Sequence, residues 1–97
     1  MIFAELEYQK DYSDMHAELV AFARSRFSRV ESGIQGDSWI WILDGGEKVQ
    51  IDTFTSMKHQ VKSAKPGPHL QSVIEALLGN YKMKVYETPM PEGHEPG

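Results

Sequence analysis

The stretch that decides the fold is Asp37–Phe54, D-S-W-I-W-I-L-D-G-G-E-K-V-Q-I-D-T-F. Apolar residues alternate with other side chains on both sides of Gly45-Gly46, a pattern typical of a β-hairpin with a tight turn. Two adjacent glycines accept the positive φ angles of such a turn, so we expect a loop with an even number of residues. An odd loop would reverse the faces of one strand.

An even loop fixes which residues of the two strands stand opposite each other and share a face. The aliphatic pairs on one face are Ile40 with Ile51 and Ile42 with Val49. The pairs on the other face are Trp39 with Asp52, Trp41 with Gln50 and Leu43 with Lys48. The hairpin therefore directs its aliphatic residues toward a core and its tryptophans away from it.

Alternation with period two predicts further strands around the hairpin. These strands lie at residues 2–8, 57–64 and 81–87, and residues 28–33 form a short strand or a connector. The segment 57–64 carries Lys58 and Lys62. We expect it at an edge of the sheet, where lysines discourage pairing with another chain.

Apolar residues at three- and four-residue spacing predict two amphipathic helices. The first begins after an N-cap at Ser13 and buries Met15 and Leu19. The second begins near Pro68, which suits the first turn of a helix, and ends at Gly79.

The expected class is α+β: a two-layer sandwich, with a mostly antiparallel sheet and both helices on one face. In element order alone it resembles the ferredoxin-like β-α-β-β-α-β arrangement with an extra strand. We assign residues 1–88 to a single domain and residues 89–97, rich in proline and glycine, to a flexible C-terminal tail.

The net charge, the lack of cysteine and the distribution of apolar residues exclude several classes of function. The 97 residues carry a net charge of −4, so general attraction to nucleic acid or an anionic membrane is not expected. The chain lacks cysteine, which excludes disulfides and thiolate chemistry and fits a cytoplasmic location. It shows neither a signal peptide nor an apolar run long enough to span a membrane.

The face opposite the helices is the expected interaction face. Its apolar members are Phe3, Trp39, Trp41, Leu43 and Tyr86. Each tryptophan offers roughly 200 Å² for burial, and covering both would contribute several kcal/mol at about 25 cal/mol per Å². We expect a homodimer first, because isologous pairing is the commonest oligomer. Other possible covers are a protein partner, a ligand, the tail, or residues 28–36 of the same chain.

A nucleic-acid surface is a further alternative. Aromatic side chains on an open sheet can stack bases while lysines meet phosphates. The stacking candidates are Trp39, Trp41 and Tyr86, and the phosphate candidates are Lys48, Lys82 and Lys84. The carboxylates of Glu5, Glu7 and Asp52 on the same face oppose this interpretation. Lys58, His59, Lys62 and Lys65 form a basic strip that could contact an anion or an acidic partner.

An enzyme would need a pocket on the sheet face, using His59 or the carboxylates of Glu5 and Glu7. However, no histidine has a second ligand at metal-binding spacing, and no phosphate loop or nucleophile motif occurs. We therefore assign no catalytic, cofactor-binding or metal-binding residue. The sequence predicts a small non-enzymatic binding or assembly protein.

Overall fold

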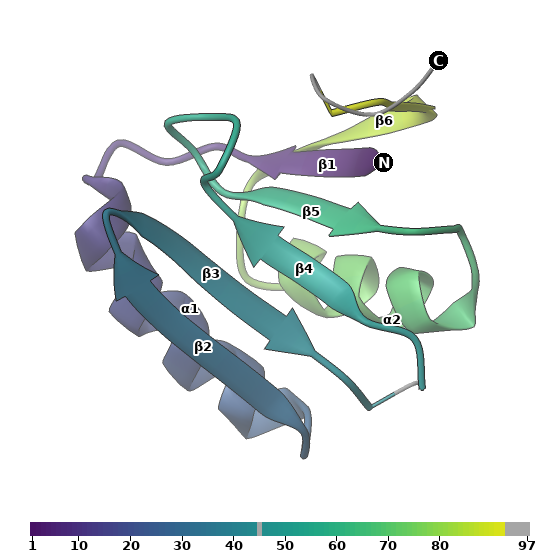
Figure 1. Cartoon of the computed structure of the whole chain (residues 1–97), viewed down its shortest axis with the longest axis horizontal. Helices are drawn as coiled ribbons and strands as arrows, with labels where there is room; N and C mark the ends of the chain where they lie inside the picture. The colour runs from purple at the N-terminus through teal and green to yellow at the C-terminus, as the bar shows by residue number, and fades with distance from the viewer. Residues whose placement is uncertain (45, 93–97) are drawn as a thin grey trace.

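The computed structural model describes residues 1–44 and 46–92. Its elements are β1 Ile2–Leu6, α1 Tyr12–Arg26, β2 Val30–Gln35, β3 Asp37–Ile42, β4 Val49–Asp52, β5 Gln60–Ser63, α2 Pro68–Leu78 and β6 Met83–Met90. All adjacent strands are antiparallel, in the order β2-β3-β4-β5-β1-β6. Both helices lie behind the sheet in Figure 1. The predicted α+β class with two layers is confirmed.

The hairpin has the register that an even loop predicts. Ile40 pairs with Ile51 and Ile42 with Val49, and all four side chains are buried in the core. Trp39 pairs with Asp52, which places both on the opposite face. The residues that pair in the hairpin thus separate into a core face and a second face, as expected.

Strand β5 corrects the edge-strand prediction. It lies between β4 and β1, and all four of its residues are buried. The edges are instead β2 and β6, and β2 pairs with β3 along its whole length. The lysines of this segment suggested an edge strand. However, the Lys62 side chain is buried and paired with Asp52, so it does not protect an edge.

A bulge in β1 corrects the placement of Phe3. Ile2 pairs with Lys62 while Ala4 pairs with Val61, so two steps along β1 match one step along β5. Such a bulge shifts the alternation of faces by one residue. Ile2 therefore shares a face with Lys62, whereas Phe3 belongs to the core cluster on the helix side. The prediction that Phe3 lies on the interaction face is wrong.

The ends of the helices follow local chemistry. Asp11, not Ser13, is the N-cap of α1, and its carboxylate accepts a hydrogen bond from the Ser13 amide. Pro68 occupies the first turn of α2 and Gly79 is its C-cap, as predicted. Residues 89 and 90, predicted as the start of the tail, belong to β6. Residues 93–97 lie outside the described residues.

Candidate functional site

The tryptophans lie on the face of the sheet that the helices leave uncovered. We call this surface the tryptophan strip, and it consists of Glu31, Gly33, Trp39, Trp41, Lys48 and Gln50. On β2, Glu31 stands opposite Trp41 and Gly33 opposite Trp39. On β4, Gln50 stands opposite Trp41. Residues directly opposite each other in antiparallel strands share a face, so these side chains form one surface.

The two indole rings contact each other, with ring centroids 4.6 Å apart and planes inclined by 41°. The ammonium group of Lys48 lies 4.0 Å from the centroid of the Trp41 ring, a cation–π geometry. Gly33 provides the space for Trp39, because a Cβ atom there would lie 2.6 Å from the indole. The Trp39 ring thus packs against β2 at Gly33.

The chain itself covers part of this aromatic pair. Both tryptophans are half-buried. The Nε1 atom of Trp41 is buried and has no hydrogen-bond partner within the described part of the chain. Segment 28–36 contains the neighbouring strand β2, which contacts the Trp39 ring at Gly33. It does not fold over the rings. The accessible part of each ring remains available for contact with another molecule.

The remainder of this face is covered by the loop that joins β4 to β5. The Thr55 hydroxyl donates to the Gln60 side chain at 2.8 Å, and the Ser56 hydroxyl donates to the Glu5 carboxylate at 2.9 Å. Both acceptors lie on strands β5 and β1. The loop therefore separates the accessible part of this face on β2, β3 and β4 from β6.

A buried ion pair lies beneath this loop. The Nζ atom of Lys62 is 2.6 Å from Oδ1 of Asp52, and it also contacts Glu92 Oε2 at 3.1 Å and Thr55 Oγ1 at 3.2 Å. These three oxygens match the three protons of the ammonium group. Burial raises the pKa of Asp52, although the ammonium group of Lys62 opposes this shift. In this arrangement Lys62 has no ammonium proton left for an external anion.

The other residues of the predicted interaction face are not brought together. Tyr86 and Lys84 lie on β6, at the opposite edge of the sheet from β2 and β3, with the Lys84 ammonium 5.6 Å from the Tyr86 ring. Lys82 precedes β6, and Lys58 lies 4.5 Å from the ring of Tyr8. Leu43 is half-buried next to β3. An extended base-stacking surface from Trp39 to Tyr86 is therefore interrupted by the covered strands.

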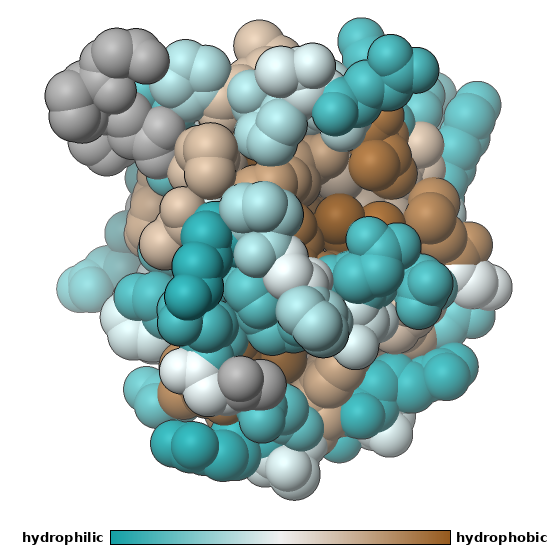
Figure 2. Space-filling model, turned by 90° about the vertical axis from the view of Figure 1, so that its right-hand side faces the viewer, coloured by the Kyte–Doolittle hydropathy of each residue, from teal (hydrophilic) through white to brown (hydrophobic). Residues whose placement is uncertain are grey.

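Phe3 lines a separate apolar hollow of about 300 Å³ between α2 and β6, together with Leu70, Ile74 and Val85. Figure 2 shows apolar side chains gathered on this side of the molecule. Val85 stands in register with the buried Ala4 yet is 44% exposed. Strand β6 thus extends past the cover that the helices provide.

A hydrogen-bonded chain on the helix side was not foreseen from the sequence. Tyr8 Oη lies 2.7 Å from His59 Nδ1, His59 Nε2 lies 2.7 Å from Ser38 Oγ, and Ser38 Oγ lies 2.6 Å from His16 Nδ1. The chain connects β3 and α1 with the segments that follow β1 and precede β5. Ser38 lies two residues before Ile40 on β3 and therefore faces the core as well. A polar residue on a core face requires hydrogen-bond partners, and this was the signal in the sequence for such a network.

The histidines of this hydrogen-bonded network are neutral at physiological pH. Burial, and to a smaller extent the charge of His16, lowers the pKa of His59 to about 4. Burial also lowers the pKa of His16. Ser38 and His59 have no exposed surface, so a substrate could not reach the hydroxyl group without opening the core. The arrangement suits a structural network that joins α1 to the sheet.

The carboxylates of Glu5 and Glu7 line a hollow of about 440 Å³ with Tyr8, Lys58 and Lys82. His59 is not among its lining residues. Tyr8, which lines this hollow, separates it from His59 by one hydrogen bond to His59 Nδ1.

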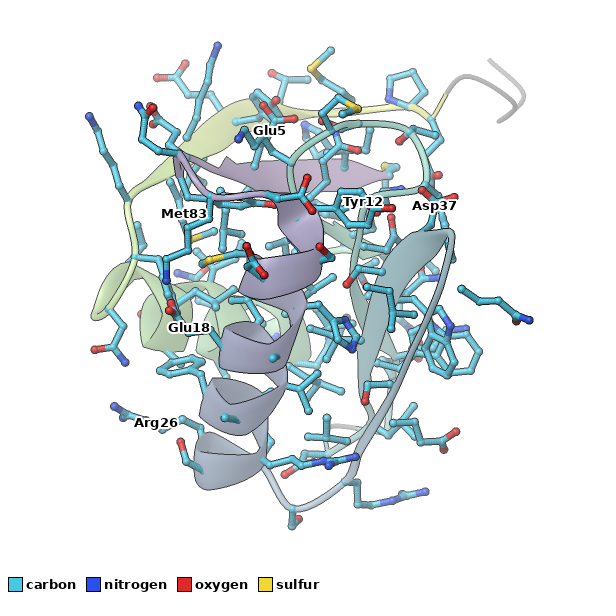
Figure 3. All side chains as sticks on the ribbon, turned by 90° about the vertical axis from the view of Figure 1, so that its left-hand side faces the viewer. Glu5, Tyr12, Glu18, Arg26, Asp37 and Met83 are labelled. Atoms are coloured by element: carbon cyan, nitrogen blue, oxygen red, sulfur yellow. The ribbon has the colours of Figure 1, made fainter. Side chains whose placement is uncertain are left out.

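Figure 3 shows the junction of α1 with the sheet. Tyr12, at the start of α1, points toward the turn between β2 and β3, where its hydroxyl donates to the carbonyl oxygen of Gly36. In residues 1–44 and 46–92, no group of three or more His, Asp or Glu side chains could hold a metal ion. Neither described helix has the length and apolarity needed to cross a membrane.

The fold and this surface define a small α+β domain whose uncovered sheet face carries a tryptophan pair. No family model matches the chain, no curated protein matches it, and no solved structure matches it.

Proposed function

We propose that this chain is a binding or assembly protein without catalytic activity of its own, and that the tryptophan strip contacts its protein partner. The contact between Trp39 and Trp41 on a sheet face without a covering helix carries this proposal. Tryptophan is enriched where a few residues supply most of the binding energy of an interface. A reducing compartment such as the cytoplasm fits a chain without cysteine.

The strip has the composition of an interface centre with a polar rim. The two indoles occupy the middle, whereas Glu31 and Lys48 are exposed beside them. The glycine at position 33 leaves room for the Trp39 ring, which lies where a side chain would stand. An open aromatic surface of this kind matches a protein partner better than an enclosed small-molecule pocket.

The test replaces Trp41 by Glu, which places a charge in the centre of the strip. The matched control is Leu78→Glu, because Leu78 is also an exposed apolar residue but lies on α2. Circular dichroism and thermal melting establish that each variant is folded. The readouts are the molar mass in solution and the proteins recovered with a tagged chain from its own cells.

We expect Trp41→Glu to lose an association that the wild type and Leu78→Glu both retain. The opposite result is that the wild type and folded Trp41→Glu have the same mass and recover the same proteins. That result would exclude the strip as the binding surface.

A further inference from the structure

We infer that the partner on the tryptophan strip is a second copy of this chain, related to the first by a two-fold axis parallel to β3. This inference rests on the proposed function of the strip. The inference specifies which molecule binds to the strip and in which orientation. Two independent features of the surface support it. The first is the arrangement of charges around Trp41, and the second is the position of the loop between β4 and β5.

Opposite charges lie on the two sides of Trp41. Glu31 stands opposite Trp41 on β2, and Lys48 lies on the β4 side with its ammonium group 4.0 Å from the Trp41 ring. Both residues are exposed. The strip therefore carries one negative charge on its β2 side and one positive charge on its β4 side.

This asymmetry distinguishes the two arrangements in which identical sheet faces meet with their strands aligned. A two-fold axis that relates two facing sheets lies in the plane between them. If it runs parallel to β3, the β2 side of one copy faces the β4 side of the other. Lys48 of each copy then lies opposite Glu31 of the other copy, which gives two equivalent contacts. If it runs perpendicular to β3, Lys48 faces Lys48 and Glu31 faces Glu31. Repulsion between like charges disfavours the second arrangement.

The loop between β4 and β5 selects the same axis. Its residues Thr55 and Ser56 bond to side chains of β5 and β1, so the loop projects over those strands. With the axis parallel to β3, the loop of each copy lies beyond the β2 edge of the other copy. With the perpendicular axis, β5 faces β5, so both loops lie between the same strands and hold the two faces apart. The allowed arrangement keeps the strands of both sheets aligned, which is a common mode of sheet packing.

The experiment is a charge exchange, measured as a dimer dissociation constant by analytical ultracentrifugation at low salt. The variants are Lys48→Glu, Glu31→Lys and the double variant Glu31→Lys/Lys48→Glu. Each single substitution alters two symmetry-related contacts, so we expect dimerisation to weaken at least about tenfold. The double variant should return to within about threefold of the wild type. Raising the salt concentration should reduce these differences, because exposed charges are screened.

The possible failures are distinguishable. A double variant as weak as the single variants would overturn the proposed axis. A monomeric wild type, together with a different protein that is lost from Trp41→Glu, would overturn self-pairing but retain the binding function. A wild-type dimer that persists unchanged in folded Trp41→Glu would overturn self-pairing through the strip, and it would overturn both proposals if the two proteins also recover the same partners.

Discussion

The Nζ atom of Lys62 lies 2.6 Å from Oδ1 of Asp52, and each of the two side chains is only 1% exposed. The pair occupies the middle of the sheet, on neighbouring strands β4 and β5. Glu92, which follows β6, adds a second carboxylate at 3.1 Å. One ammonium group therefore connects two strands with the segment that leaves the sheet.

Replacing Lys62 by Met should strongly destabilise the fold. The substitution retains most of the apolar stem but leaves the Asp52 carboxylate buried without its cation, which costs about 3–5 kcal/mol in comparable buried pairs. Urea unfolding measures the change. The control is Lys65→Met, because Lys65 forms an exposed ion pair with Glu47 and should contribute less than about 1 kcal/mol. Equal losses in the two variants would contradict the central role of Lys62.

His59 should make stability depend on pH in mildly acidic solution. Its pKa falls from 6.5 to about 4 on folding, so the unfolded chain binds a proton that the folded chain does not. The stabilisation is complete above pH 6.5 and is lost as the pH falls from 6.5 to 4. A shift of this size corresponds to roughly 3 kcal/mol across that range.

The measurement compares urea midpoints of the wild type and His59→Gln between pH 7.5 and 4.5. Carboxylates such as Asp52 titrate in both proteins, so the difference between the two pH profiles isolates His59. We expect His59→Gln to be less stable at pH 7.5 but to show a flatter decline below pH 6.5. Parallel profiles would show that His59 does not carry the proton linkage.

Gly33→Ala should displace the Trp39 indole, because the new Cβ atom would lie 2.6 Å from the ring. Such overpacking costs about 1–3 kcal/mol in stability, and the movement should change the tryptophan emission spectrum. Gly79→Ala is the matched control, since its Cβ atom would lie 3.4 Å from the nearest backbone oxygen. An unchanged emission spectrum in Gly33→Ala would mean that Trp39 does not rest on β2.

Phe3→Ala tests the bulge in β1. Because Phe3 lies in the core on the helix side, truncation should cost about 3–5 kcal/mol in the free energy of unfolding. Phe54→Ala removes the same atoms from a residue that is 49% exposed and should cost much less. Similar small losses for both variants would instead support a regular β1 strand with Phe3 on the uncovered face.

The sequence by itself determined the parts of the fold that depend on local periodicity. Alternation around Gly45-Gly46 gave the hairpin register, which in turn placed Ile40 in the core and Trp39 on the other face. Helical spacing located α1 and α2, and Pro68 marked the start of the second. These features follow from backbone geometry and the hydrophobic pattern, which act over a few residues.

Only the tertiary structure decided the positions of the residues that depart from the local pattern. Lys62 looked like an edge residue because sequence reasoning could not see Asp52 and Glu92 converging on its ammonium group. The bulge between Ile2 and Ala4 exchanged the faces of Ile2 and Phe3, since pairing with two neighbouring strands overrides the local alternation. The loop over β5 likewise reduced the broad predicted interaction face to the tryptophan strip. Each of these outcomes depends on partners far apart in the chain, and local periodicity carries no information about such partners.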